Sequence, residues 1–203
     1  RAEVEKQQKA AKTGYACPIL DTAVVETGGI THFLILMPKL DGMELFDTAC
    51  ELAQLPATAK RFPEEKQASL IDDLHTVQLY LTQQMTQALS ALHTAGVTHV
   101  DYGLENLMLS RSGDLAVLDF GNAENGDVPV GREKLSAKIQ TGWPQDLGRR
   151  FGYPPQSADI DIAFLGINMY RLSVGEFGNR SLDKNFSYVR DGNPLKPLLN
   201  LIF

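Results

Sequence analysis

Apolar residues recur every three or four positions over a long stretch in the middle of the chain. Between Gln67 and Ala95 their spacing is that of an amphipathic helix, and Gly96 stands where such a helix would end. The apolar positions are Leu70, Ile71, Leu74, Val77, Leu81, Met85, Leu89 and Leu92. The pattern predicts one long helix over residues 67–95 with a single buried face.

The first 63 residues carry shorter patterns. Strong helix formers precede Gly14, whereas residues 19–40 hold two apolar runs that are separated by the turn formers 26–29. We therefore expect a helix over residues 1–13, strands over 19–25 and 32–40, a short helix over 41–55 and a loop over 55–63.

Two more short strands are expected after the long helix. They span residues 106–110 and 115–119 and are joined by the polar turn 111–114. Because this turn makes the strands antiparallel, Asp119 at the end of the second strand returns beside Asn106 at the start of the first. An amide oxygen and a carboxylate that converge in this way suit Mg²⁺, which keeps several waters and takes further ligands from substrate phosphates.

Asp101 lies in the loop five residues before Asn106. At this position its carboxylate could accept a proton from a hydroxyl that is aimed at a metal-bound phosphate. The simpler alternative is that Asp101 and Asn106 only close a turn and that Asp119 only caps a strand end. That alternative leaves the joint spacing of the three residues unexplained.

The segment also resembles two motifs of the protein kinase superfamily. His99, Asp101 and Asn106 match the catalytic loop H-x-D-x-x-x-x-N, and Asp119-Phe120-Gly121 matches the D-F-G motif. Either motif alone is weakly specific. Their conjunction, with a hairpin between them and a long helix before them, is a specific signal.

The resemblance implies an α+β fold with the two lobes of a protein kinase. Residues 1–40 would be the remnant of a small, β-rich N-lobe with one helix, two strands and the hinge. Residues 41–203 would form a mainly helical, abbreviated C-lobe, with the catalytic loop at 98–106 and the activation segment at 119–156. The end of that segment, from Gly152 to Gln156, is weakly similar to A-P-E, and residues 161–172 resemble the central helix of the C-lobe.

The same resemblance implies roles for individual residues, with ATP and Mg²⁺ as cofactors. Asp101 would be the catalytic base, and Asn106 and Asp119 would bind the metal. Met37 would be the gatekeeper, Pro38 and Leu40 would offer backbone groups to adenine, and Glu44 would reach the ribose. Glu105 and Met108 would border the nucleotide, with Met108 as the floor under adenine.

Further residues would support this site. His99 and Phe120 would stack on each other, and Gly121 would complete the D-F-G turn. Asp161 would accept hydrogen bonds from the catalytic-loop backbone. In the family a helix glutamate pairs with a strand lysine. Glu5 is the first candidate for that glutamate and Glu3 the second, although a solvated helical face explains both acids equally well.

The N-terminal part departs from the family pattern. Neither the Gly-rich phosphate loop nor the strand lysine that holds the phosphates is present in the sequence. Because Arg1 falls inside a predicted helix, we expect both features to precede Arg1.

The catalytic and activation regions depart from the pattern as well. Gly103 stands where many Ser/Thr kinases have a lysine that touches the γ-phosphate, and Arg132, Lys134 and Lys138 are candidate substitutes. Val100 replaces the arginine before the catalytic aspartate, which is the non-RD pattern. We therefore expect that phosphorylation of Ser136 or Thr141 is not the main switch.

Composition adds few constraints. The net charge of −6 gives no basic footprint for nucleic acid, and no apolar run is long enough to span a membrane. Cys17 and Cys50 are too few for a disulfide framework, so a cytoplasmic site of action fits best, including a host cytoplasm if the protein is a delivered effector.

The leading hypothesis is a Mg·ATP-dependent transferase that phosphorylates Ser/Thr hydroxyls of a protein substrate. An activating protein partner is possible, and the oligomeric state stays open. One alternative is a small-molecule kinase of the aminoglycoside or choline type, which uses the same loop and tolerates the missing lysine. The other is a pseudokinase that binds partners without turnover, which is supported by Gly103 in place of the lysine.

Overall fold

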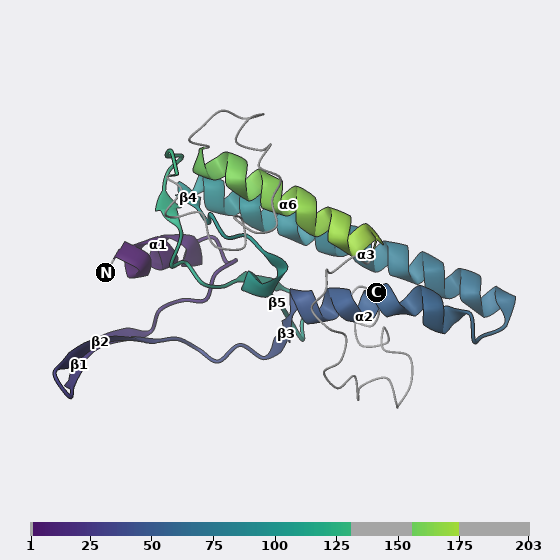
Figure 1. Ribbon diagram of the computed structural model, residues 1–203, viewed down its shortest axis with the longest axis horizontal. Helices are drawn as coiled ribbons and strands as arrows, with labels where there is room; N and C mark the ends of the chain where they lie inside the picture. The colour runs from purple at the N-terminus through teal and green to yellow at the C-terminus, as the bar shows by residue number, and fades with distance from the viewer. Residues whose placement is uncertain (1, 131–155, 175–203) are drawn as a thin grey trace.

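The computed structural model describes residues 2–130 and 156–174, and it has an elongated α+β architecture (Figure 1). Three helices lie along one another and form the body of the molecule. A hairpin of two strands extends away from this body, and short strands lie between the two parts (Figure 1). The α+β class expected from the sequence is confirmed.

Helix α3 (Glu64–Thr94) is the longest element of the body. It packs against α2 (Leu45–Ala59) on one side and α6 (Ser157–Val174) on the other (Figure 1). Its buried face includes Leu74, Val77, Leu81, Met85, Leu89 and Leu92. The predicted helix over 67–95 is confirmed, but it begins three residues earlier, directly after Pro63, with two glutamates in its first turn.

The short helix predicted over residues 41–55 is wrong at both ends. Gly42–Glu44 forms strand β3, and α2 continues through Pro56 to Ala59. Leu55 and Ala59 are buried, so the packing of this last turn outweighs the hydrogen bond that Pro56 cannot donate. Residues 55–59 are therefore helical, and only the rest of the predicted loop lies outside α2.

Strand β3 belongs to a three-stranded antiparallel sheet with β5 (Leu107–Ser110) in the centre and β6 (Leu115–Val117) on the other side. The predicted hairpin is confirmed, with each strand shorter than expected. A side chain on Gly42 would collide with the backbone carbonyl of Leu109, so glycine permits the close approach of β3 to β5. This sheet carries the chain that leaves the catalytic loop.

A second, very small sheet pairs β4 (Val97–Thr98) with β7 (Glu124–Asn125). Thr98 is opposite Glu124 in the antiparallel register, directly before His99. This pairing fixes the chain that follows the D-F-G motif against the chain that enters the catalytic loop.

The projecting hairpin consists of β1 (Asp21–Thr27) and β2 (Ile30–Leu36). The predicted strands are confirmed in kind, but their bounds and the four-residue turn are wrong. Gly28 and Gly29 alone form the turn, both at positive φ, and therefore Glu26 and Thr27 remain in the strand. The second strand ends at Leu36, not at residue 40.

Helix α1 (Ala2–Ala11) lies between the hairpin and the body (Figure 1). Its buried residues are Gln7 and Ala10, which confirms the expected N-terminal helix within slightly shorter bounds. Across residues 2–130 and 156–174 the helices are too short or too polar to cross a bilayer.

Candidate active site

Asp161 fixes the backbone of the catalytic loop by hydrogen bonds. It lies in α6 with no exposed surface, and its carboxylate accepts hydrogen bonds from the backbone N–H of His99 (2.7 Å) and Val100 (2.6 Å). His93 Nε2, at the end of α3, lies 2.8 Å from the same carboxylate. One buried acid thus joins α3 and α6 to the loop. One of the two N–H groups that it binds belongs to Val100, which has a left-handed φ of 67°.

Tyr102 and Asn168 extend this support, and the sequence did not reveal either. The Tyr102 hydroxyl donates to the backbone O of Met85 (2.8 Å), and Asn168 Nδ2 donates to the backbone O of Tyr102 (2.8 Å). Burial raises the pKa of Tyr102 far above its ordinary value, so the phenol stays neutral and keeps its donor. Asn168 follows Asp161 by seven residues, two helical turns, and this spacing was the available signal.

Asn106 is the residue that brings the two acids together. Its side-chain Nδ2 donates to the backbone O of Asp101 (2.7 Å), and its own backbone O accepts from the N–H of Leu118 (2.8 Å). Asp119 directly follows Leu118. The three predicted residues Asp101, Asn106 and Asp119 therefore converge at one end of the hairpin.

The Asp101 carboxylate lies at the edge of the core and is 7% exposed as a residue. Its Oδ1 is buried and has no hydrogen-bond partner among the described residues. Its Oδ2 is 3.5 Å from Nδ2 of Asn122, a long contact. A buried acceptor without a partner is uncommon in folded proteins, which marks this carboxylate as a candidate functional group.

Asp119 and Phe120 face opposite ways from a strained backbone. Asp119 has a φ of 57°, is exposed, and accepts a hydrogen bond at Oδ1 from the N–H of Gly121 (3.1 Å). Phe120 is fully buried, with its ring edge-to-face on His99 at 5.1 Å between centroids. His99 Nε2 also lies 2.8 Å from the backbone O of Leu118. The expected stacking partners thus anchor the turn that leaves Asp119 at the surface.

The donor set at this end fits a hard divalent cation. The Asn106 amide uses its nitrogen on Asp101, which leaves Oδ1 as the acceptor, and Asp119 adds a carboxylate. Magnesium commonly takes one or two protein oxygens and completes its shell with water and phosphate. Among the described residues no group of three or more His, Cys, Asp or Glu side chains has metal-binding geometry, so a site closed by protein ligands alone is not present there.

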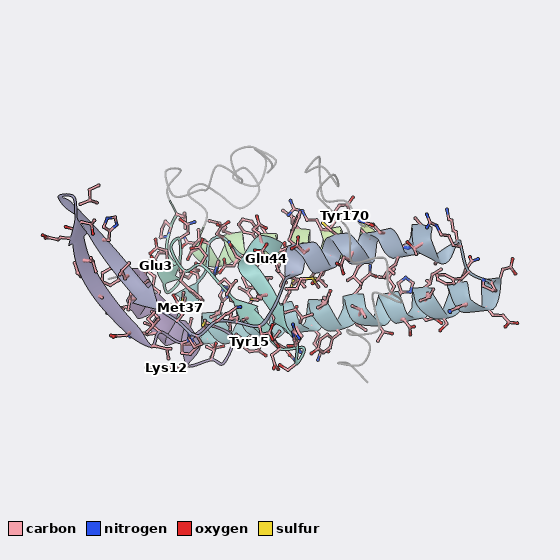
Figure 2. All side chains as sticks on the ribbon, turned by 90° about the horizontal axis from the view of Figure 1, so that it is seen from below. Glu3, Lys12, Tyr15, Met37, Glu44 and Tyr170 are labelled. Atoms are coloured by element: carbon pink, nitrogen blue, oxygen red, sulfur yellow. The ribbon has the colours of Figure 1, made fainter. Side chains whose placement is uncertain are left out.

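Of the residues predicted to border the nucleotide, those up to Glu44 lie along the connection from the hairpin to α2, whereas Glu105 and Met108 lie after the catalytic loop, Glu105 in a short 3₁₀ helix and Met108 in β5. Figure 2 labels Met37 where the hairpin ends and Glu44 where α2 begins. Glu44 is opposite Met108 in the register of β3 and β5, so these two are brought together. Met37 Sδ instead accepts a hydrogen bond from Gln7 Nε2 of α1 (2.8 Å). The backbone O of Pro38 accepts one from the Cys17 thiol (3.6 Å). Leu40 is half-buried nearby, and the adenine contacts stay predictions.

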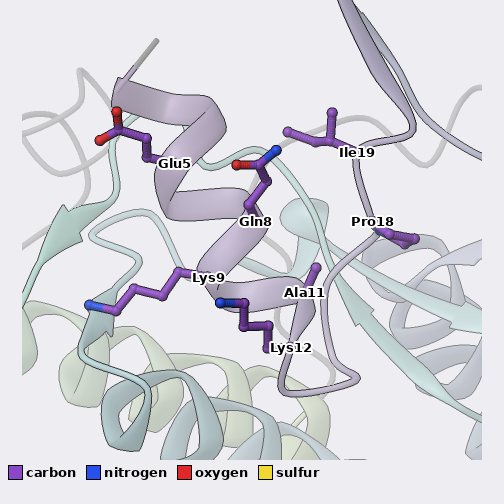
Figure 3. Close-up of a pocket in the computed structure, with 7 residues that line it drawn as sticks. All are labelled: Glu5, Gln8, Lys9, Ala11, Lys12, Pro18 and Ile19. Atoms are coloured by element: carbon purple, nitrogen blue, oxygen red, sulfur yellow. The ribbon is translucent and has the colours of Figure 1, made fainter.

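The two glutamates of α1 lie on different faces of the helix. Glu5 is exposed and lines a pocket of about 450 Å³ on the outer side of α1 (Figure 3). Glu3 precedes the buried Gln7 by four residues and therefore shares its face. Glu3 is nevertheless exposed, as Glu5 is, so neither acid is buried against the connection that carries Met37. The pairing of either acid with a strand lysine stays a prediction.

A lysine at position 103 of the catalytic loop would require the Glu105 side chain to move. A Cβ on Gly103 would come within 2.6 Å of Oε2 of Glu105, so a lysine at this position would have to displace that carboxylate. Several predictions on the activation segment lie outside the described residues: those for Arg132, Lys134, Ser136, Lys138, Thr141 and the A-P-E-like stretch at 152–155.

Comparisons with known proteins match this chain to phosphotransferases and kinases. A model of the APH phosphotransferase enzyme family matches residues 25–128, just over half of the chain. Hormonally up-regulated neu tumor-associated kinase homolog B of Xenopus laevis is 30% identical over 105 residues, 50% of this chain and 16% of the relative. Protein kinase kin1 of Schizosaccharomyces pombe is 27% identical over 180 residues, 88% of this chain and 17% of the relative. CBL-interacting protein kinase 25 of rice (Oryza sativa subsp. japonica) is 34% identical over 99 residues, 46% of this chain and 18% of the relative.

The chain spans less than a fifth of the length of each of these relatives. The matches agree with the motifs at His99–Asn106 and Asp119–Gly121 and with a small β part followed by helices. The chain therefore belongs to the phosphotransferase enzyme family and has a kinase-like fold of the protein kinase superfamily.

Proposed function

We propose that this chain carries out ATP- and magnesium-dependent transfer of a phosphoryl group to Ser/Thr hydroxyls of a protein. The observation that carries the proposal is the double role of Asn106, which binds the backbone of Asp101 and pairs with Leu118 next to Asp119. One residue thereby sets the distance between the proposed base and the proposed metal ligand.

Asp101 would orient the substrate hydroxyl and accept its proton. The buried Oδ1 offers a hydrogen-bond acceptor that no described residue uses. The backbone around Asp101 is held by Asp161 at Val100 and by Asn168 at Tyr102, which limits the reorganisation needed when the hydroxyl arrives. General bases positioned in this way typically contribute about 10²–10⁴-fold to a rate.

Asn106 Oδ1 and the Asp119 carboxylate would hold Mg²⁺, with Glu44, Glu105 and Met108 beside the nucleotide. Bound Mg²⁺ supplies positive charge to the phosphate oxygens as charge develops during transfer. Asp119 is exposed, so it can meet a ligand from solvent, while Phe120 anchors the same turn in the core.

A protein substrate is supported by two of the relatives, which are named as protein kinases. The sequence features similar to A-P-E and to the large-lobe central helix favour the same class. The activating partner and the cytoplasmic site of action stay part of the proposal.

The test is incubation of the full-length protein with labelled ATP, Mg²⁺ and a mixed Ser/Thr protein substrate. Asp101→Ala and Asp119→Ala should each lower transfer by at least about 10³-fold, because a base or a metal ligand is lost. Asp72→Ala removes an exposed acid of α3 and should leave transfer unchanged. Nucleotide binding should survive in Asp101→Ala and weaken in Asp119→Ala. Full transfer in either site variant would refute the assignment.

The family match favours a second candidate, phosphorylation of small cationic hydroxy compounds. A panel of aminoglycosides and choline in the same assay separates the two. Transfer to these compounds and to no protein would establish the second candidate. A nucleotide-dependent thermal shift without transfer to any acceptor would indicate a pseudokinase.

A further inference from the structure

Lys6 of α1 contacts the chain just after the D-F-G motif. Its Nζ donates a hydrogen bond to the backbone O of Ala123 and lies 3.7 Å from Oε2 of Glu124. The side chains of Lys6 and Glu124 are only 12% and 16% exposed. A largely buried ammonium group is stable only with acceptors such as this carbonyl and carboxylate, so the contact stabilises the interface between α1 and the body.

Ala123, whose carbonyl Lys6 contacts, closes a tight turn with its N–H, and this turn begins next to Asp119. Ala123 N–H donates to the backbone O of Phe120 (3.1 Å), and Gly121 N–H donates to Asp119 Oδ1 (3.1 Å). The two hydrogen bonds and the backbone of residues 119–123 therefore connect the Asp119 carboxylate to the residue whose carbonyl Lys6 binds. Asp119 has the left-handed φ of 57°, which requires support from its surroundings.

The other side of this segment is held by strand pairing. Glu124 and Asn125 form β7 against β4, and Gly126 N–H donates to the backbone O of Gly96 (2.9 Å). The chain after Asp119 is thus held between β4 on one side and Lys6 on the other. Lys6 is the contact that reaches this turn from α1.

We infer that Lys6 is a positioning residue for Asp119, setting the metal-binding carboxylate through the Phe120–Ala123 turn. The inference rests on the proposed function, in which Asp119 binds Mg²⁺. Groups that orient metal ligands from outside the coordination shell commonly affect metal affinity about 10–100-fold. Because Lys6 acts through a turn, we expect an effect at the lower end of that range.

Lys9 provides a matched control on the same helix. Its Nζ also donates to a backbone carbonyl, that of Gly96 (3.0 Å), which accepts from Gly126 N–H as well. Lys9→Met therefore removes a similar lysine contact of α1 without touching the Phe120–Ala123 turn. Lys6→Arg keeps a charged donor at position 6 and should preserve the effect of Lys6.

The first readout needs no metal. In the metal-free chain, hydrogen–deuterium exchange of peptides covering residues 119–126 should be several-fold faster in Lys6→Met than in the unsubstituted chain. In Lys6→Arg the exchange over residues 119–126 should be near that of the unsubstituted chain. In Lys9→Met the exchange at residues 119–122 should be near that of the unsubstituted chain. Unchanged exchange at residues 119–122 in Lys6→Met would overturn the inference.

The second readout is the Mg²⁺ concentration that gives half of the thermal shift produced by a non-hydrolysable ATP analogue. Lys6→Met should raise this midpoint about tenfold and Lys9→Met less than about twofold. Faster exchange with an unchanged midpoint in Lys6→Met would also overturn the inference. No magnesium dependence in the unsubstituted chain would refute the proposed role of Asp119 itself, and the exchange data would then separately decide whether Lys6 orders the turn.

Discussion

The projecting hairpin and the helical body bury their apolar residues to very different degrees. In α3, Val77, Leu81 and Met85 have no exposed surface, whereas Leu34 and Leu36 in β2 are 51% and 58% exposed. Both faces of the hairpin carry such residues, because Val24 is paired with Phe33 on one face and Ala23 with Leu34 on the other. Strands that are apolar on both faces are typical of sheets covered on both sides.

The difference separates the two halves of the proposed site. Asp101, Asn106 and Asp119 belong to the body, where helix packing and buried hydrogen bonds fix their backbone. The backbone groups of Pro38 and Leu40, which are proposed to meet adenine, follow the hairpin, and the hairpin is covered on neither face within the described residues. An isolated two-stranded hairpin has marginal stability in water. We therefore expect the body to unfold as one cooperative unit and the hairpin to contribute little to it.

The largest effect is expected at Asp161. Asp161→Ala leaves the backbone N–H groups of His99 and Val100 buried without their acceptor, which should lower the free energy of unfolding by roughly 3–5 kcal/mol. Urea unfolding followed by circular dichroism measures the change. Asp159→Asn, two residues away and half-buried in the same helix, is the control and should cost under about 1 kcal/mol. A small effect at Asp161 would mean that the body does not depend on this buried acid.

A pair of leucines tests the comparison directly. Leu81→Ala in α3 creates a cavity in the core and should cost about 3 kcal/mol of unfolding free energy. Leu34→Ala in β2 removes a half-exposed side chain and should cost less than about 0.5 kcal/mol. Both are read from the same urea titration. Equal costs would show that the hairpin is packed as tightly as the body, against the comparison.

Elements with a long repeat or a clear turn could be predicted from sequence. The helix over 67–95 was recognised because its apolar residues follow the helical period over many turns, and the hairpin after Asn106 because Ser112-Gly113-Asp114 is a strong turn former. The convergence of Asn106 and Asp119 followed from that hairpin. Spacing alone was sufficient here because the chemistry lies on elements adjacent in sequence.

Elements that depend on distant contacts could not be predicted in this way. Strand β3 has three residues and exists because it pairs with β5, and α2 passes through Pro56 because Leu55 and Ala59 are buried. The hydrogen bond from Tyr102 to Met85 and the contact of Lys6 with Ala123 join residues far apart along the chain. Propensity carries no information about such pairs.

Two turn glycines sharpen the comparison at a smaller scale. Gly113, with a φ of 89°, joins β5 to β6, and its carbonyl accepts a hydrogen bond from the Tyr80 hydroxyl (3.1 Å). Gly113→Ala should cost about 1–2 kcal/mol in global unfolding because alanine is strained at this φ. Gly28→Ala, at a φ of 60°, should raise hydrogen exchange over residues 21–36 and leave the global midpoint unchanged. A shift of the global midpoint by Gly28→Ala would couple the hairpin to the body.

The smallest effect is expected at Glu51, a half-buried acid of α2. Burial raises the pKa of Glu51 above its ordinary value of 4.5, and the negative charge of Asp47 raises it further. Because the folded state holds the proton more tightly than the unfolded state, the charged carboxylate opposes folding at neutral pH, and this penalty disappears as pH falls below 4.5. Glu51→Gln should therefore raise the free energy of unfolding at pH 7 by at most about 0.5 kcal/mol, since solvent screens a half-exposed charge. Urea titrations of both proteins at pH 7 and pH 4 measure the difference, which should vanish at the lower pH. Glu26→Gln, on the exposed hairpin, should change neither value, and a gain from Glu51→Gln that persists at pH 4 would show that charge is not its cause.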